Sequence, residues 1–268
     1  MSGQRTNVLQ RIAARTRERC KEMREKTPLE GLVLKARAAA EEGEPTFLFE
    51  RSLKAPGMSF ICECKKASPS KGLIADDYDP VRIARAYEDA GAAAISCLTE
   101  PHFFEGDDRH LSDIARQVGV PVLRKDFVVD EYMIYQAKVL GADAVLLICS
   151  ILEDEELANF VDLCHRLGLS ALVEAYEPDE VPRAIEAGAR VVGVNNRDLR
   201  TFSVDFGRSI DLRPLVGPDR IFVSESGVQT AQDVSRLHDA HVDAVLIGET
   251  LMRATDVRAA LDDLRSGL

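Results

Sequence analysis

The sequence predicts an α/β fold, a (β/α)8 TIM barrel with an N-terminal helical extension. Three observations support this prediction: a length of 268 residues, eight short apolar segments of strand character, and amphipathic helical segments between them that end at glycine. A barrel of eight βα units takes roughly 250 residues. We therefore expect one domain overall, in which residues 1–56 form a helical extension packed on the barrel and residues 57–268 form the barrel itself.

The extension has a mostly helical pattern. Its clearest signal is the peptide Thr27-Pro28-Leu29-Glu30, which matches a capping box with proline at the first helical position. This peptide predicts a helix from Pro28 through Ala40. Such an extension can close the bottom of a barrel or reach over its mouth, and the sequence leaves both placements open.

The eight strands are short runs of Val, Ile, Leu and Ala between longer helical patterns. Near-continuous apolar runs of this kind indicate parallel strands covered on both faces, and eight of them favour a closed barrel over an open doubly wound sheet. The G-x-G-x-x-G fingerprint of a dinucleotide-binding sheet is absent after the first run. The predicted strands are Ser59–Lys65, Ala93–Leu98, Val122–Lys125, Ala144–Ile148, Ala171–Glu174, Val191–Asn195, Ile221–Glu225 and Ala244–Gly248.

The helices between these strands end at a recurring glycine. Glycine adopts the left-handed conformation at low cost, so it is the usual residue where a helix stops and the chain turns back. We expect this conformation in the joints Asp89-Ala90-Gly91, Gln117-Val118-Gly119, Val139-Leu140-Gly141, Arg166-Leu167-Gly168 and Glu186-Ala187-Gly188.

Composition and charge narrow the classes of partner. The net charge of −11 argues against nucleic acid and acidic membrane surfaces, because binding to polyanions depends on clustered Lys and Arg. The first 19 residues are too polar for a signal peptide, and no apolar run approaches the ~18 residues of a membrane span. We therefore expect a cytoplasmic protein. The six cysteines and five histidines show no metal-ligand spacing, so we expect free, packed thiols and no bound metal.

Polar side chains gather at the predicted C-terminal ends of the strands, which is where barrels of this kind place their active sites. Glu63 and Lys65 are two residues apart and share one face of the first strand, whereas Cys62 and Cys64 face the helices. The other strand-end residues are Thr99-Glu100, Lys125-Asp126, Glu174, Asn195-Asn196-Arg197 and Glu225-Ser226-Gly227. Inward-facing lysines and glutamates shift one another's pKa values and suit proton transfer.

Two loops predict a phosphate site. Ser226-Gly227-Val228 and Gly248-Glu249-Thr250 follow the seventh and eighth strands, and each precedes a short helical segment. In this fold these two loops are the usual phosphate site, because glycine lets an anion approach unpaired backbone N–H groups. The residues alone therefore indicate an enzyme acting on a small phosphorylated metabolite.

Several strand-end peptides carry a resemblance to one known family. They are Glu63-Cys64-Lys65-Lys66-Ala67-Ser68-Pro69-Ser70-Lys71-Gly72, Leu98-Thr99-Glu100 with Phe104 and Gly106, Leu123-Arg124-Lys125-Asp126-Phe127, residues 141–148, Gly193-Val194-Asn195-Asn196-Arg197-Asp198-Leu199, Ser224-Glu225-Ser226-Gly227 and Leu246-Ile247-Gly248-Glu249. In this order and spacing the chain closely resembles indole-3-glycerol phosphate synthase, a lyase of tryptophan biosynthesis.

The resemblance implies a substrate, 1-(2-carboxyphenylamino)-1-deoxy-D-ribulose 5-phosphate, which undergoes ring closure, decarboxylation and dehydration without metal or organic cofactor. It implies other enzymes of the tryptophan pathway as functional neighbours. By the same resemblance, Lys125 is the general acid of ring closure and Glu174 a base in the dehydration. Lys65 holds an anionic group and donates a proton in the second step, while Glu63, Asn195 and Glu225 orient these groups and bind sugar hydroxyls.

The resemblance also implies the binding residues. Phosphate is expected on Ser226, Gly227, Gly248 and Glu249, largely through backbone amides. The anthranilate ring is expected among Phe104, Phe127, Leu146 and Leu199, with Ser68 and Arg197 as loop and carboxylate contacts.

Two further expectations concern dynamics and pKa. A lysine in a dry pocket beside other cations has a lowered pKa, which we expect for the acid Lys125, whereas Glu63 keeps Lys65 charged. Residues 67–79 form a long βα loop, which we expect to be mobile and to close over the site. The chain ends soon after the eighth helical pattern, at Leu268, so we expect no second, fused barrel.

Two alternative functions remain at this point. An isomerase of the same pathway, acting on the N-linked phosphoribosyl precursor, shares the phosphate site but does not need the set Lys65, Lys125 and Glu174. A non-catalytic phosphosugar-binding barrel needs none of the strand-end acids and bases.

Overall fold

The computed structural model describes residues 8–41, 47–75 and 77–268, and its centre is a closed barrel of eight parallel strands. Going round the barrel, the order is β1-β10-β9-β8-β7-β6-β5-β4, and β4 pairs with β1 to close it. The strands are β1 (Ser59–Cys64), β4 (Ala94–Leu98), β5 (Val122–Lys125), β6 (Ala144–Ile148), β7 (Ser170–Ala175), β8 (Val191–Asn195), β9 (Ile221–Glu225) and β10 (Ala244–Ile247). The predicted fold class is confirmed, and every predicted strand end lies within one residue of the observed one.

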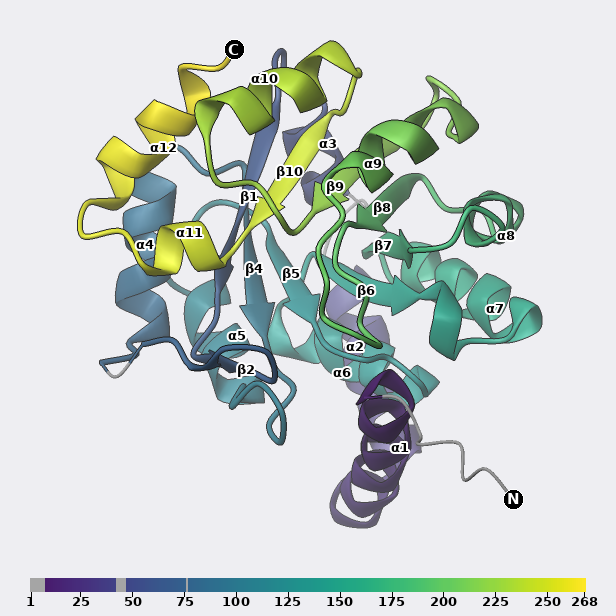
Figure 1. Cartoon of the computed structure of the whole chain (residues 1–268). Helices are drawn as coiled ribbons and strands as arrows, with labels where there is room; N and C mark the ends of the chain where they lie inside the picture. The colour runs from purple at the N-terminus through teal and green to yellow at the C-terminus, as the bar shows by residue number, and fades with distance from the viewer. Residues whose placement is uncertain (1–7, 42–46, 76) are drawn as a thin grey trace, which may run out of the picture.

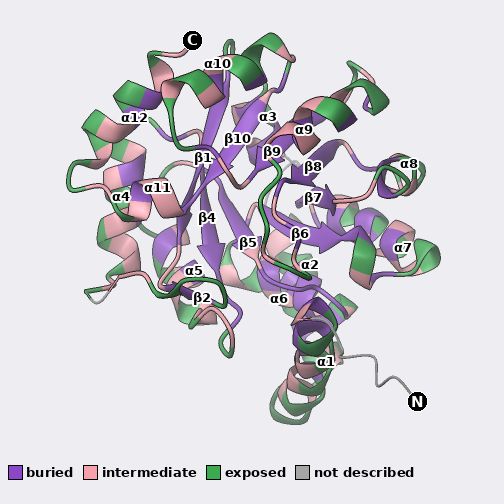
Figure 2. Ribbon diagram, viewed as in Figure 1, coloured by how far each residue is buried: buried purple, intermediate pink, exposed green. Residues whose placement is uncertain are grey.

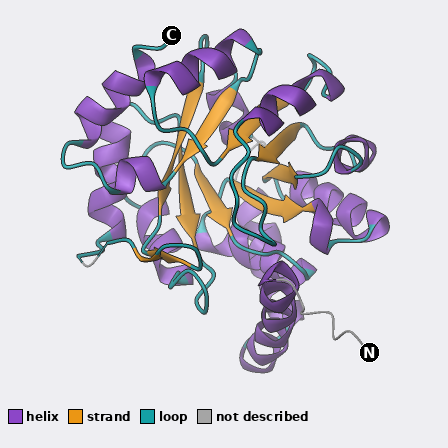
Figure 3. Cartoon of the chain, viewed as in Figure 1, coloured by secondary structure: helices purple, strands orange, loops and turns teal. Residues whose placement is uncertain are grey.

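Helices cover the outside of the barrel (Figure 1, Figure 3). After β1 the chain forms a two-stranded antiparallel piece, β2 (Ala67–Ser68) with β3 (Gly72–Leu73), before the first covering helix. The covering segments are α4 (Pro80–Asp89), α5 (Asp108–Ala115), α6 (Glu131–Leu140), η1 (Cys149–Ile151), α7 (Asp154–Arg166), α8 (Glu180–Glu186), α9 (Gly207–Leu212), η2 (Arg213–Leu215), α10 (Ala231–Asp239), α11 (Glu249–Met252) and α12 (Val257–Arg265).

The strands divide the core into two layers. Residues such as Cys62 and Cys64 pack outward against the helices, while Ile61, Leu123 and Leu172 fill the barrel interior. Figure 2 shows the strands as a buried centre and the outer helix faces as exposed. The predicted division of the first strand is therefore confirmed: its cysteines face the helices. All six cysteines are free and buried.

The N-terminal helices are α1 (Val8–Lys26), α2 (Leu29–Glu41) and α3 (Leu48–Leu53). The helix α2 packs against α6 on the outside of the barrel, whereas α1 and α3 lie at its two ends. At the bottom, Phe49 and Leu53 of α3 join the interior cluster. At the C-terminal ends of the strands, Arg19 of α1 donates two hydrogen bonds of 2.8 Å to the Asp126 carboxylate, directly after β5. The extension thus lies both at the bottom of the barrel and at its mouth, the two positions that the sequence left open.

Two local predictions are wrong. The helix expected to begin at Pro28 begins at Leu29, because the Thr27 N–H still bonds to the Met23 carbonyl and extends the end of α1. Glycines 91, 141, 168 and 188 have the expected positive φ, but Gly119 does not. Its N–H donates to a Glu88 carboxylate oxygen on the neighbouring helix, so the turn there is held by a side chain and needs no left-handed residue.

Candidate active site

A cavity of about 740 Å³ opens at the C-terminal ends of the strands. This volume is in the range of pockets that enclose a small metabolite. Every residue to which the resemblance assigns catalysis or substrate binding lies on its wall: Glu63, Lys65, Ser68, Phe104, Lys125, Phe127, Leu146, Glu174, Asn195, Arg197, Leu199, Glu225, Ser226, Gly227, Gly248 and Glu249. Strand ends that are up to 186 positions apart in sequence, from Glu63 to Glu249, thus meet in one cavity.

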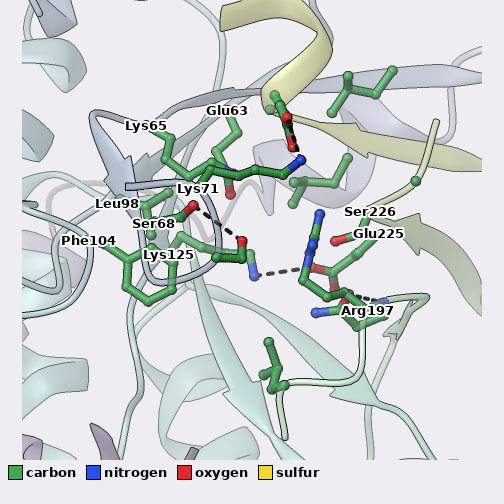
Figure 4. Close-up of a pocket in the computed structure, with 18 of the residues that line it drawn as sticks. Glu63, Lys65, Ser68, Lys71, Leu98, Phe104, Lys125, Arg197, Glu225 and Ser226 are labelled. Atoms are coloured by element: carbon green, nitrogen blue, oxygen red, sulfur yellow. Dashed lines mark hydrogen bonds and ion pairs between the residues drawn. The ribbon is translucent and has the colours of Figure 1, made fainter. Parts of the chain in front are cut away.

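Lys125 lies in the centre of this cavity between two carboxylates (Figure 4). Its Nζ is 3.4 Å from Glu174 Oε2 and 3.2 Å from Glu225 Oε2. Asn195 Nδ2 donates to the same Glu174 oxygen at 3.1 Å. Both glutamates are buried, so the ammonium group is held in a poorly solvated site between carboxylates from two other strands.

The expected lowering of the Lys125 pKa is wrong. Burial alone lowers the pKa, but Glu225, Glu174 and Glu63 outweigh it, and the pKa of Lys125 is raised. The prediction assumed neighbouring cations, whereas the nearest charges are carboxylates. Lys125 is therefore a fully protonated ammonium at neutral pH, and it carries a proton that it can donate.

Unlike Glu63 and Glu174, Glu225 accepts no hydrogen bond from the described residues. Burial, together with the nearby Glu174 charge, raises the pKa of Glu225 to about 8, although Lys125 opposes the shift. The contact with Lys125 has the distance of an ion pair but not the direction of a hydrogen bond, so neither Glu225 oxygen has a hydrogen-bond partner among the described residues. Room for this side chain comes from Gly193 in β8, because a Cβ there would collide with Glu225 Oε1.

A second lysine forms a tighter pair on the adjoining wall. Lys65 Nζ donates to Glu63 Oε1 at 2.6 Å. Burial raises the pKa of Glu63, but Lys65 and Lys125 outweigh it and the pKa is lowered, which keeps this carboxylate ionised. Gly248 approaches the pair closely: a Cβ on it would lie 2.6 Å from Glu63 Oε1 and 2.9 Å from Lys65 Nζ. The backbone after β10 therefore reaches the Lys65 ammonium only because residue 248 is glycine.

The loops after β9 and β10 form the polar end of the cavity. Ser226 and Gly227 have φ values of 67° and 93°, so two consecutive residues are left-handed. Across from them, the Glu249 carboxylate lies 3.3 Å from Lys71 Nζ and 3.3 Å from Arg253 Nε. In Figure 4, Lys71 reaches from the loop after β1 across the cavity toward α11.

Apolar side chains form the opposite wall. The Phe104 and Phe127 rings have centroids 5.9 Å apart, and Leu146 and Leu199 join the same interior cluster. An aromatic ring of a ligand can be buried against these surfaces while its charged groups face the lysines.

Not every strand-end polar residue contributes to the cavity. Thr99 donates a 2.7 Å hydrogen bond to Asp126, and the Glu100 carboxylate accepts the backbone N–H groups of residues 102–104. These contacts shape the loop that carries Phe104, and neither Thr99 nor Glu100 lines the cavity. Asp126 does line it, but its carboxylate is bonded to Arg19 and Thr99.

Sequence reasoning gave no role to Lys71, Arg253 or the side chain of Asn196. Lys71 lies in a loop whose Ser-Pro and Lys-Gly composition is equally typical of a solvated connection, and Arg253 lies beyond the strand end on α11's C-terminal side. Within the described residues there is no cluster of three His, Cys, Asp or Glu side chains that could hold a metal ion. None of the described helices is long and apolar enough to cross a membrane.

Comparison with known proteins gives a consistent result. Residues 9–264 match the model of a family described as indole-3-glycerol phosphate synthase. Proteins of that name from Lachnoclostridium phytofermentans and Ruminiclostridium cellulolyticum are 48% and 50% identical, over 97% and 96% of this chain and 99% and 98% of theirs.

Solved structures with low sequence identity share the barrel. A 3-hexulose-6-phosphate synthase from Salmonella typhimurium has a TM-score of 0.65 at 14% identity, covering 79% of this chain and 98% of that one. A thiamine phosphate pyrophosphorylase from Pyrococcus furiosus has a TM-score of 0.57 at 18% identity, covering 78% and 94%. At these identities the likeness concerns the fold alone.

Proposed function

Because the chain belongs to the indole-3-glycerol phosphate synthase family, we propose how the residues of the cavity divide the family's reaction among them. The reaction is a step of tryptophan biosynthesis. It converts 1-(2-carboxyphenylamino)-1-deoxy-D-ribulose 5-phosphate to indole-3-glycerol phosphate, CO2 and water. The observation that carries the assignment of roles is the Lys125 ammonium between Glu174 and Glu225, with an apolar wall on one side and a polar, glycine-containing end on the other.

Lys125 is the general acid of ring closure in this proposal. The aromatic carbon attacks the ketone carbon, a C–C bond forms, and the ketone oxygen takes a proton from Lys125 as it becomes a hydroxyl. A lysine with a raised pKa still donates readily here, because the oxygen developing negative charge is more basic than an amine. Loss of CO2 then returns its electron pair to the ring and restores aromaticity.

Glu174 and Lys65 act in the dehydration. Lys65 donates a proton to the departing hydroxyl, which leaves as water, and Glu174 accepts the proton released from the adjacent ring methylene, so that a C=C bond forms and the indole keeps its N–H. Asn195, bonded to Glu174, and Glu63, bonded to Lys65, hold these two groups in place. Glu225, whose oxygens lack a protein partner, is free to accept hydrogen bonds from the sugar hydroxyls.

The substrate lies across the cavity with its phosphate at the polar end. Backbone amides of Ser226, Gly227, Gly248 and Glu249 bind the phosphate, and Lys65 lies close to this end. The aryl ring lies among Phe104, Phe127, Leu146 and Leu199, while Ser68 and Arg197 contact the loop-side groups and the carboxylate. Lys71 joins the phosphate ligands by exchanging the Glu249 carboxylate for the substrate's anion.

Activity of the purified protein tests the proposal. Without added metal it should convert the carboxyphenylamino deoxyribulose phosphate to indole-3-glycerol phosphate, followed by indole absorbance or fluorescence. Binding of a phosphate-bearing analogue without turnover would overturn the catalytic assignment and favour the non-catalytic barrel.

The variant Lys125→Ala tests the acid. We expect kcat to fall by about 10²–10⁴, the usual contribution of a general acid, while affinity for a non-reacting substrate analogue stays near that of the unmodified protein. Lys66→Ala is the matched control, because the Lys66 side chain pairs with Glu105 and lies outside the cavity wall. Near-normal turnover of Lys125→Ala would remove Lys125 from the acid role.

We further propose that the protein works in the cytoplasm beside other enzymes of the tryptophan pathway, and that residues 1–56 and 57–268 act as one domain. The first proposal is supported by the chain's membership of a biosynthetic enzyme family, and the second by the buried contact between Arg19 and Asp126. Cell fractionation followed by immunodetection tests the location, and a single cooperative unfolding transition tests the domain.

A further inference from the structure

The Ser226–Gly227 backbone has a conformation that its sequence does not favour. A non-glycine residue with positive φ is uncommon, and Ser226 has φ 67°. Such a residue persists only where its surroundings hold it. The neighbouring side chains should therefore include one that fixes this peptide.

Asn196, immediately after β8, is that side chain. It is fully buried and does not line the cavity. Its Nδ2 donates to the Ser226 carbonyl oxygen at 2.9 Å and to Ser224 Oγ at 3.1 Å, and its Oδ1 accepts from Ser209 N at 3.0 Å and Ser209 Oγ at 2.8 Å. The amide thus uses both donors and both acceptor sites.

The orientation of this amide is fixed by its partners. A backbone N–H can only donate, so the Ser209 N–H requires Oδ1 on its side of the Asn196 amide. The Ser226 carbonyl can only accept, and it requires Nδ2 on the other side. Turning the amide over would lose both contacts, so Asn196 holds the Ser226 carbonyl on the buried side.

The geometry of the peptide bond carries this constraint into the cavity. The Ser226–Gly227 peptide is trans, as are all peptide bonds in the described residues. In a trans peptide the C=O and N–H groups point to opposite sides. Because the Ser226 carbonyl points to Asn196, the Gly227 N–H points away from it, toward the cavity that Ser226 and Gly227 line.

We propose that Asn196 is a positioning residue that aims the Gly227 N–H at the substrate phosphate. This inference rests on the proposed phosphate site. Asn196 touches no substrate atom; it acts by fixing the direction of one peptide and by stabilising the left-handed Ser226. The backbone supports the same arrangement, because the Asn196 N–H donates to the Glu225 carbonyl at 2.8 Å and ties the ends of β8 and β9 together.

The first test uses the unmodified protein and inorganic phosphate. In a ¹H–¹⁵N correlation spectrum, phosphate should move the Gly227 amide proton downfield in a saturable way, as expected for a new hydrogen bond to an anion. If phosphate binds without moving this resonance, or does not bind, the phosphate site itself is wrong, and the proposed function fails at that point.

The second test uses Asn196→Asp and Asn196→Ala. Aspartate keeps the shape and the acceptor that faces Ser209 but cannot donate to the Ser226 carbonyl, and alanine removes the group without adding charge. We expect KM and the inhibition constant of inorganic phosphate to rise together by about tenfold or more, the effect of a misplaced hydrogen bond to a charged group, with kcat within about twofold. A folded variant with an unchanged phosphate inhibition constant, or with a lowered kcat and unchanged KM, would overturn the role of Asn196 while leaving the phosphate site intact.

Two further variants separate positioning from loss of stability. Val181→Ala removes buried volume in α8, away from the cavity, and should leave the phosphate inhibition constant unchanged. Ser226→Gly, made in the Asn196→Ala background, should recover part of the lost phosphate affinity, because glycine adopts positive φ without help. If the two substitutions weaken phosphate binding independently, Asn196 does not act through the conformation of Ser226.

Discussion

Replacing Arg19 by methionine should destabilise the protein far more than an ordinary surface substitution. Arg19 lies on α1, and its guanidinium donates two 2.8 Å hydrogen bonds to Asp126, whose side chain is fully buried. Burial raises the pKa of Asp126, but Arg19 and Arg124 outweigh it and lower the pKa. Removing Arg19 therefore leaves a charged carboxylate in the interior with less compensation.

The remaining contacts of Asp126 set the magnitude. Breaking a buried pair by removing one partner costs about 3–5 kcal/mol. Asp126 keeps hydrogen bonds from Thr99 Oγ1 at 2.7 Å and from the Phe127 N–H at 2.8 Å, and Arg124 lies 3.6 Å away. We therefore expect the lower end, about 3 kcal/mol, which for a chain of this size lowers Tm by about 6–12 °C.

Thermal and chemical denaturation at pH 7 measure this change. Arg24→Met is the matched control on the same helix: Arg24 pairs with Asp130 at 2.6 Å, but both side chains are about one-third exposed, so the loss should stay below about 1 kcal/mol. In the Arg19→Met background, Asp126→Asn should restore stability, because the buried group no longer carries a charge.

The pH dependence has a definite sign. A lowered carboxyl pKa stabilises the folded state above the unfolded pKa, near 4, and this contribution disappears as pH falls through the folded value. The stability of Arg19→Met should therefore approach that of the unmodified protein in acid. A loss at pH 7 no larger than that of Arg24→Met would refute the reasoning.

Two other predictions concern the cavity. Glu225 becomes fully ionised only above its raised pKa of about 8, and the added negative charge makes Lys125 a weaker acid. The ratio kcat/KM should therefore fall above about pH 8 in the unmodified protein, and Glu225→Gln should lack this ionisation; an identical profile in the variant would assign it to another group. Lys71→Met should raise KM about tenfold with little change in kcat, whereas Glu249→Gln should lower KM because it removes an anion that competes for Lys71. Steady-state kinetics at two salt concentrations test this: if the KM changes come only from non-specific charge, added salt should abolish them in both variants.

The strands and their polar ends could be predicted from local pattern. An apolar run that ends in a charged residue identifies both the strand and its catalytic end, so the positions of Glu63, Lys125 and Glu174 followed directly. Other residues of the cavity wall, such as Phe104 and Leu199, were predicted only from the resemblance to a known family. The structure places all of these residues around one cavity, while their individual roles stay predictions.

The electrostatic environment could not be predicted in the same way. The pKa of Lys125 depends on carboxylates from three other strands, and their approach is set by barrel closure and by the space at Gly193. The proposed role of Asn196 could not be predicted from the sequence either, because Asn195 and Asn196 are adjacent residues of the same type. Only the structure shows that Asn195 lines the cavity and that Asn196 is buried behind it.

The contact between Arg19 and Asp126 also affects the order in which the protein is made. The two residues are 107 positions apart, and synthesis at about 5–20 residues per second separates their emergence from the ribosome by roughly 5 to 20 s. During that time Asp126 is not yet available to pair with Arg19, so the apolar residues of α1 that are buried in the folded protein, such as Leu9 and Ile12, lack this anchor. The helix α1 can therefore make its contact with Asp126 only after 107 further residues have been synthesised.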